Sequence, residues 1–386
     1  MTDQRRPPIA IAMTSLPLPF SQARLIFRWL LIIGVACSLG VVVSLLLNAH
    51  IEFGYDFQSY WSAAQRAQMG QTPYAPHMLS GSVDAIGTDH YRYPPPLALV
   101  LSALVPLGRA WGLWIWTAVS AAVLIAALEG VRRLATDRRV RIWFWPAVIL
   151  FIPTTMAMLE GNVTPLLAAC FAAILIGAKT NRPLLTGLGW GLGALLKLEP
   201  GLLAVWLLRR RAWAALGLGL ATIVIVSALS LIWPAGIVGW RDYPTALLSM
   251  LSGSSAYVQN ATPASLLQLS LPALREISTL LMIIQAMAAV ALVWMTANRS
   301  IAASFMLASA AAVLMGPPIW AHSLLVLLPA GLYLYDADPQ VRPWLGAAFT
   351  CASLGIFFSP LLLLGISLAI VAGLRSNSND SPTVAA

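Results

Sequence analysis

The chain has 386 residues and a net charge of +9, yet only 10% of its residues are charged and 59% are hydrophobic. Its mean hydropathy is +0.80. A soluble domain carries about a quarter charged residues. Apolar runs recur along nearly the whole chain, and about 20 such residues cross the hydrocarbon layer as a helix. The composition therefore excludes an ordinary soluble domain and predicts an all-α integral membrane protein.

The excess positive charge indicates topology rather than a nucleic-acid partner. The basic residues cluster between the apolar runs, at Arg24 and Arg28, 132–141, Lys179 and Arg182, 209–211, and Arg299. Loops rich in Lys and Arg stay cytoplasmic, so we expect the N-terminus inside. Cys37, Cys170 and Cys351 are far apart and lie in apolar stretches. We interpret them as small core residues without a disulfide or metal role.

The order of apolar and polar segments predicts one membrane domain between two cytoplasmic tails. Residues 1–24 form a Pro-rich, disordered tail, and residues 375–386 form a second tail. The domain between them, residues 25–374, begins with a retained first helix at 25–49. Its apolar runs predict roughly 11 to 13 transmembrane helices.

The first outer loop, residues 48–93, is predicted to carry a helix of its own. The stretch from Asp56 to Met69 places Phe57, Trp61 and Ala64 on one stripe, as in an amphipathic helix. The run that begins at Gly70 and contains Pro73 stops it. Such a helix would lie at the interface and hold Asp56 near headgroup level.

Two later segments are too short, or wrongly placed, for complete crossings. If 97–107 and 110–131 both crossed, the basic loop that follows would fall outside, so we expect 97–107 to be short or re-entrant. The segment 184–208 is too short for two spans and is predicted to be a broken hairpin with Lys197 at its tip. Three tryptophans, Trp111, Trp114 and Trp116, are interpreted as interface anchors.

The polar residues predicted on the outer side share one location, close to the ends of spans. They are Asp56, His90, Arg92, Glu160, Asn162, Lys197, Glu199, Arg241, Asp242, Asn260 and His322. Ionisable groups at such depths are functional by default. A carboxylate able to act as a base, next to cations able to hold a phosphate, suits group transfer from a phosphate-linked donor. The sequence has no phosphate-cradling Gly loop and no zinc motif.

Several motifs in order resemble glycosyltransferase family 87, over roughly residues 50–330. They are Asp56-Phe57-Gln58-Ser59-Tyr60 with Tyr91-Arg92-Tyr93-Pro94-Pro95, then Gly161-Asn162-Val163-Thr164-Pro165-Leu166-Leu167, 187–200 with Lys197, and Arg209-Arg210-Arg211-Ala212-Trp213. The turn Gly316-Pro317-Pro318-Ile319-Trp320-Ala321-His322 is similar to the family's Ser-Pro-x-Ser-Trp-x-His-His, with Gly316 for the Ser and Ser323 for the second His. The family consists of multi-span transferases of the type C glycosyltransferase fold and includes mycobacterial phosphatidylinositol-mannoside mannosyltransferases.

The resemblance implies a polyprenyl-phosphate sugar donor and inverting transfer of a hexose, with mannose expected, to a lipid-linked or cell-envelope acceptor. It implies that Asp56 is the general base and that Lys197, Arg92 and His322 bind the donor phosphate. Substrate contacts are expected from Tyr60, Trp61, Tyr93, Asn162, Glu199 and Asn260. No metal or cofactor is expected. The setting implied is a bacterial inner membrane, with the active site on the periplasmic side and both termini cytoplasmic.

Other interpretations remain open at the level of sequence. The donor could carry arabinose or glucose, and a secondary transporter or lipid flippase would also have broken helices and buried charges. Asp56 could cap its own helix, and Lys197 could pair with Glu199 or reach the interface as an anchor. Arg92 could stack on its tyrosine neighbours, His322 could be an ordinary interface residue, and Glu160 and Asp242 are interpreted as solvated loop residues.

Overall fold

The computed structural model describes residues 53–81, 89–252, 260–271, 273, 277–316 and 318–378, together with positions 32, 36 and 40. Within these ranges the chain is helical and contains no strand. The predicted all-α class is therefore confirmed, and the arrangement is consistent with a membrane glycosyltransferase fold. The predicted N-terminal tail, nearly all of the first transmembrane helix and residues 379–386 lie outside the described residues.

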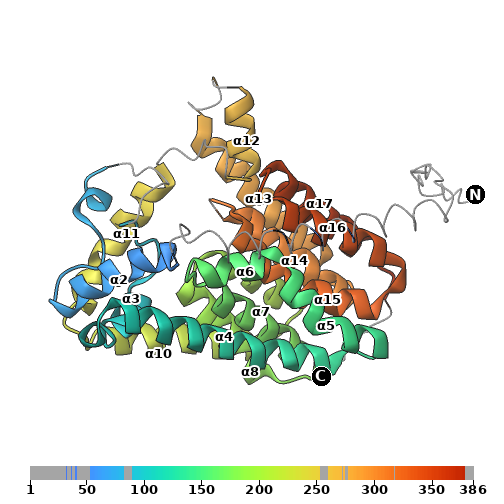
Figure 1. The fold of residues 1–386 in the computed structure, drawn as a ribbon, viewed down its shortest axis with the longest axis horizontal. Helices are drawn as coiled ribbons and strands as arrows, with labels where there is room; N and C mark the ends of the chain where they lie inside the picture. Colours follow the sequence, from blue (N-terminus) through green and yellow to red (C-terminus); the bar gives the residue numbers. More distant parts are fainter. Residues whose placement is uncertain are drawn as a thin grey trace, which may run out of the picture.

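Figure 1 colours the described helices in chain order. Those before residue 210 are α2 (Tyr55–Gln68), η1 (Pro76–Leu79), α3 (Pro95–Ser102), η2 (Val105–Leu107), α4 (Arg109–Leu134), α5 (Arg138–Leu150), α6 (Ile152–Leu159), α7 (Thr164–Lys179), α8 (Pro183–Leu196), η3 (Glu199–Leu202) and α9 (Leu203–Arg209). Those after it are α10 (Trp213–Ser230), α11 (Gly236–Ser252), α12 (Pro263–Ser270), α13 (Ser278–Thr296), α14 (Ile301–Met315), η5 (Ala321–Leu327), α15 (Leu328–Ala337), η6 (Pro339–Val341), α16 (Arg342–Leu354) and α17 (Pro360–Arg375).

Three described helices, α4, α10 and α13, are long and apolar enough to cross a membrane. The helices α5 and α6 pass the same test as a pair but are bent by 48° where they meet. Four further apolar helices, α7, α8, α14 and α17, have 14 to 16 residues, fewer than the roughly 20 that span the hydrocarbon layer upright. The larger number of spans expected from the sequence stays a prediction.

Both interrupted segments predicted from the sequence are present. The helix α3 has only 8 residues, about 12 Å at 1.5 Å per residue, and it starts at a run of prolines that presets the first helical turn. The helix α8 ends at Leu196, Lys197 adopts an extended conformation, and the chain turns back through η3 into α9. The predicted broken hairpin with Lys197 at its tip is confirmed.

The core is built on helices that approach one another through small residues. The helix α14 is buried over its whole length from Ile301 to Val313, as expected of a helix that is apolar on every side. The helix α8 packs between α7 and α10 through glycines. A Cβ at Gly189 would lie 2.8 Å from the carbonyl oxygen of Cys170, and one at Gly191 would lie 2.6 Å from that of Gly219. Such close backbone contacts are typical of packing between membrane helices.

The amphipathic helix predicted in the first outer loop is α2, within one residue of its expected bounds. Phe57, Trp61 and Ala64 are all buried, so its apolar stripe faces protein. Figure 1 shows α2 and α3 beside α11 at one end of the molecule, with α14 to α17 at the other. The first-loop helix therefore packs onto the helical body.

At the junction between α4 and α5, one buried carboxylate ties the chain to α15. Asp336 accepts hydrogen bonds from Thr136 N (2.7 Å), Thr136 Oγ1 (3.0 Å) and Asp137 N (2.8 Å). Asp336→Ala leaves these donors without an acceptor and should lower the free energy of unfolding by about 3 kcal/mol. Thermal unfolding in detergent measures this loss. Glu129→Ala, which removes only surface ion pairs on α4, should shift the transition much less, and equal shifts would contradict the prediction.

Candidate active site

The first turn of α2 docks on the end of α6, and this contact brings Asp56 to the site. Gly54 N donates to Leu159 O (2.8 Å), while Asp56 N and Phe57 N donate to Glu160 O (2.9 and 3.2 Å). The first N–H groups and the last carbonyls of a helix have no partner within that helix. Here the two helix ends satisfy each other, so the backbone of Asp56 is fixed against the loop that begins at Glu160.

Two glycines in the left-handed region allow this close approach. Gly54 has φ +82° and Gly161 has φ +62°, a conformation that costs most other residues about 1–2 kcal/mol. A Cβ on Gly161 would lie 3.0 Å from Phe57 Cβ and 3.4 Å from Gly54 Cα. The loop is held from its other side by Trp116, whose indole N–H donates to Gly161 O (2.7 Å).

The Trp116 contact corrects one sequence-based interpretation. Trp111 and Trp114 are exposed, as expected of interface anchors, but Trp116 is only 6% exposed. Its ring packs near Phe57 and Tyr60. The helical spacing of the three tryptophans places Trp116 on the opposite, inward side of α4, so it supports the site instead of anchoring the helix.

Gly161→Ala should separate α2 from the 160–163 loop. The new methyl group meets Phe57 and the backbone of Gly54, and the positive φ adds a strain of about 1 to 2 kcal/mol. We expect a lower unfolding temperature together with a loss of turnover larger than that loss of stability explains. Gly217→Ala on α10, where a Cβ would meet nothing within 4 Å, is the control. A Gly161→Ala protein with full activity would contradict this account of the docking.

The Asp56 carboxylate faces the loop and not its own helix. Oδ2 accepts from Asn162 Nδ2 at 2.5 Å, while the N-cap of α2 is Gly54 and makes no side-chain cap bond. The capping interpretation of Asp56 is therefore wrong. Asn162 is oriented by Thr164, whose backbone N–H donates to Asn162 Oδ1 (2.7 Å) and whose hydroxyl donates to the same oxygen.

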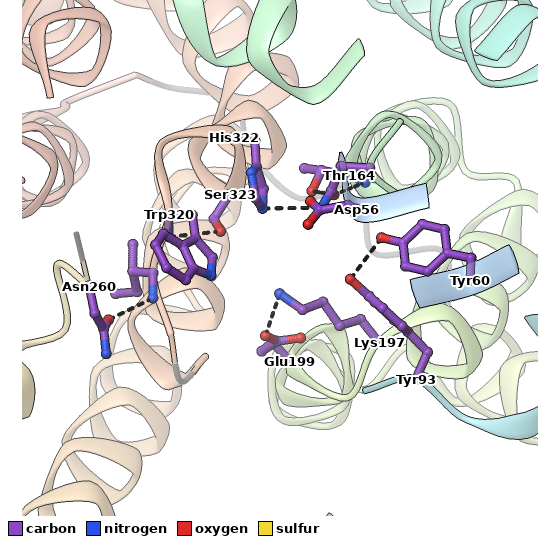
Figure 2. A network of polar contacts seen from close by, with 12 residues as sticks. Asp56, Tyr60, Tyr93, Thr164, Lys197, Glu199, Asn260, Trp320, His322 and Ser323 are labelled. Carbon is purple, nitrogen blue, oxygen red and sulfur yellow. Dashed lines mark hydrogen bonds and ion pairs between the residues drawn. The ribbon is translucent and has the colours of Figure 1, made fainter. Parts of the chain in front are cut away.

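His322 and Glu160 complete a connected group of four side chains, of which Figure 2 labels Asp56 and His322. Asn162 Nδ2 also lies 3.2 Å from His322 Nε2. The other ring nitrogen, Nδ1, lies 2.5 Å from Glu160 Oε2. Glu160 was interpreted as a solvated loop residue, and this contact shows that interpretation to be wrong. Sequence spacing gave no signal, because the two residues are 162 positions apart.

The turn that carries His322 is held by hydrogen bonds of its own. Ser323, which stands where the family pattern has a second His, accepts from Trp320 N through its hydroxyl (3.2 Å). Asn260 Oδ1 accepts from Ile319 N (3.0 Å) and Thr262 N (3.1 Å). Asn260 is fully buried and lies beyond Trp320 from the Asp56 group in Figure 2. In this conformation the side-chain oxygen of Asn260 braces the turn, and contact with substrate stays a prediction.

Burial and charge shift the proton affinities of the two titratable groups at the centre. Burial raises the pKa of Asp56 above its usual value, and the negative charge of Glu160 adds to this, against the opposing effects of His322, Asn162 and Arg92. Burial favours a lower pKa for His322, and Lys197 acts in the same direction. The Glu160 contact and the charge of Asp56 outweigh both, so the pKa of His322 is raised. Both groups therefore hold a proton more tightly than in water.

Lys197 lies at the break after α8 and pairs with Glu199, with 2.8 Å between Nζ and Oε1. The two side chains line one cavity together with Thr164, Gly316 and Ser323. A Cβ on Gly316 would lie 2.6 Å from Glu199 Oε1, so the Gly that replaces the family's Ser makes room for this ion pair. Arg92 is half-buried and close enough to lower the proton affinity of Asp56.

The three aromatic residues expected to contact substrate are buried in the protein core. Tyr60, Trp61 and Tyr93 are 1%, 5% and 9% exposed. Tyr60 Oη donates to Tyr93 Oη (2.9 Å) and accepts from Val163 N (3.3 Å). In this conformation they pack and position the loop after Asn162, and their contact with substrate stays a prediction.

A metal ion is one group that the geometry of the centre would accommodate. One ligand atom each from Asp56, Glu160 and His322 lies within 4.8 Å of the others. Asn162 also contacts Asp56, and Glu160 contacts His322, so two of the three possible ligands touch each other. The expectation that no metal takes part stays a prediction.

Apolar helices surround a cluster of ionisable side chains that are held at helix ends. This arrangement is typical of a membrane-embedded enzyme whose side chains transfer protons. The sequence model of glycosyltransferase family 87 matches residues 91–326, more than half of the chain. The chain belongs to glycosyltransferase family 87 and is a membrane glycosyltransferase, which decides against a transporter. No curated protein matches it significantly. Asp56 lies before the matched residues, whereas Glu160, Asn162, Lys197 and His322 lie within them.

Proposed function

We propose that the protein transfers a hexose, with mannose expected, from a polyprenyl-phosphate donor to a hydroxyl of a lipid-linked or cell-envelope acceptor. The observation that carries this proposal is the Asp56 carboxylate, which Asn162 holds where the charge of Arg92 acts on it, while the charge of Lys197 acts on the neighbouring His322. A base beside cations is what transfer from a sugar phosphate requires. The donor, the sugar and the acceptor rest on the resemblance of the motifs.

In the proposed reaction Asp56 is the general base. Its carboxylate removes the proton of the acceptor hydroxyl while the oxygen attacks the anomeric carbon from the face opposite the phosphate. The bond from that carbon to the phosphate oxygen breaks, and its electron pair leaves with the polyprenyl phosphate. A single displacement of this kind inverts the anomeric configuration. The raised pKa of Asp56 makes it a stronger base than a carboxylate in water.

Negative charge grows on the departing phosphate, and we assign its stabilisation to Lys197 and Arg92. Lys197 is partly exposed at the tip of a helix break, where its ammonium can exchange Glu199 for a phosphate oxygen. His322 was expected to share this role. Both of its ring nitrogens have protein partners, so we assign it to the base side of the site. Glu199 is proposed to hold Lys197 between turnovers.

The proposed location is the inner membrane, with the site facing the periplasm and both termini cytoplasmic. The basic segments between apolar runs support this orientation, and a polyprenyl-phosphate donor would reach the site from within the bilayer. A cysteine introduced at Ser80, an exposed position in the first loop, should react with a membrane-impermeant maleimide in intact cells. Labelling only after cell lysis would contradict the orientation.

The donor is tested with purified protein in nanodiscs and polyprenyl phosphates that carry mannose, glucose or arabinose. We expect mannose to be transferred fastest, with the product having the anomeric configuration opposite to that of the donor by NMR. Faster transfer from the glucose or arabinose donor would replace mannose by that sugar. Retention of configuration would contradict a single displacement with Asp56 as base.

Chelation tests the expectation that no metal takes part. Because the first outer loop lacks a paired-carboxylate motif, sugar transfer should be unchanged after treatment with excess EDTA. The measurement is the initial rate before and after chelation, with added Mg²⁺ or Mn²⁺ as a second arm. Full loss of transfer that either ion restores would contradict the expectation.

A further inference from the structure

The orientation of Asn162 determines which ring nitrogen of His322 carries a proton. Thr164 N–H donates to Asn162 Oδ1, so the amide cannot be turned around, and both hydrogens of Nδ2 point elsewhere. Nδ2 lies 2.5 Å from Asp56 Oδ2 and 3.2 Å from His322 Nε2. An amide N–H that points at a ring nitrogen needs a lone pair there. In this arrangement Nε2 of His322 is therefore unprotonated, and the ring proton is on Nδ1.

That proton faces Glu160. Nδ1 lies 2.5 Å from Glu160 Oε2, an ion-pair contact in which the carboxylate faces this side of the ring. A carboxylate behind an imidazole fixes its tautomer and stabilises the imidazolium that forms when the opposite nitrogen takes up a proton. Glu160 is itself fixed, because its backbone carbonyl accepts from Asp56 N and Phe57 N. One residue thus positions both the base and the imidazole.

We propose that Glu160 and His322 form a proton-accepting pair, in which Glu160 positions the ring and His322 Nε2 takes over the proton that Asp56 removes from the acceptor. This inference rests on the proposed function. The Asp56 O–H bond breaks and an N–H bond forms at Nε2, which regenerates the carboxylate and gives an imidazolium balanced by Glu160. One oxygen of Asp56 and one ring nitrogen of His322 lie within 4.8 Å of each other. A water molecule between the two side chains carries the proton once Nε2 exchanges the Asn162 N–H for that water. The imidazolium then releases its proton to water.

The proposal predicts the direction of the pH dependence. The charged groups that act on His322 are Glu160 from the end of α6, Asp56 from α2 and Lys197 from the break after α8. A proton acceptor works only when it is unprotonated, so transfer should increase as the pH rises through the pKa of His322. If His322 instead gripped the phosphate as a cation, transfer would decrease with rising pH over the same range.

Glu160→Gln tests the pair, because glutamine keeps an oxygen that accepts from Nδ1 but carries no charge. We expect the pKa of His322, measured by hydrogen–deuterium exchange at its C2 position with mass spectrometry, to fall. The acid limb of the rate profile should move to lower pH, and kcat should fall about tenfold or more while KM for the donor stays within about twofold. Glu129→Gln on α4 is the matched control and should change none of these quantities.

An unchanged pKa of His322 in Glu160→Gln, or loss of kcat with an unmoved pH profile, would overturn the proposal and leave Glu160 a structural residue. The exchange measurement needs no turnover, so it remains decisive if the proposed donor is wrong. Should Glu160→Gln fail to fold, Glu160→Asp withdraws the carboxylate by one methylene, and the pKa of His322 should fall in the same direction. An unchanged pKa in that variant would equally overturn the proposal.

Discussion

Asp56→Asn should reduce kcat for sugar transfer by about a thousandfold or more, which corresponds to roughly 4 kcal/mol of transition-state stabilisation. Asparagine has nearly the same shape as aspartate but cannot accept the proton of the acceptor hydroxyl. Binding of the donor should persist, because the proposed phosphate partners, Lys197 and Arg92, are untouched. Initial rates and donor titration, each measured in nanodiscs, separate these two effects.

The matched control is Asp89→Asn, the same chemical change at a residue paired with Arg66 on α2. This variant alters an ion pair of the first outer loop away from the Asp56 group, so it should retain most of the activity. If Asp56→Asn retained more than a few per cent of the wild-type rate while folded, Asp56 would not be the base. Equal losses in both variants would indicate damage to the loop instead.

Lys197→Ala should lower kcat by about a hundredfold to a thousandfold, the range found when one group that stabilises developing charge is removed. The loss has two parts, because the substitution also leaves Glu199 without its cation partner next to the phosphate. The double variant Lys197→Ala/Glu199→Ala removes that unbalanced charge and should recover part of the rate. Rates at saturating donor, together with KM, measure both parts.

The only other lysine in the sequence supplies the control. Lys179 ends α7 and lies over the ring of Tyr333, so Lys179→Ala should leave transfer nearly unchanged. If Lys197→Ala were as active as Lys179→Ala, Lys197 would be only an anchor or the partner of Glu199. Full recovery in the double variant would lead to the same conclusion, because repulsion by Glu199 would then explain the whole loss.

Local sequence signals predicted the helices well where the cause of a helix is local. The amphipathic stripe of α2, the prolines before α3 and the shortness of the segment around Lys197 each act within a few residues. The same signals failed for Trp116, because interface tryptophans and inward tryptophans have the same composition. Only the packing of α4 against α2 and the Gly161 loop decides which side of the helix is buried.

The candidate site, like the fold, could be predicted from the sequence only in part. The order of motifs brought Asp56, Asn162, Lys197 and His322 together as candidates, and three of them are in one hydrogen-bonded group with Glu160. Glu160 was missed because its role depends on a contact made across 162 residues. The contact by which the Asn260 oxygen braces the turn before His322 was also missed, because it joins residues 59 positions apart.

The most direct test of the central claim is a single transfer assay with three purified proteins in nanodiscs. Wild type, Asp56→Asn and Asp89→Asn each receive radiolabelled polyprenyl-phosphate mannose and a lipid extract that contains the acceptor. We expect labelled product from wild type and Asp89→Asn and essentially none from Asp56→Asn. Comparable product from folded Asp56→Asn would contradict the assignment of the base, and no product from wild type with any of the three donors would contradict the proposed reaction.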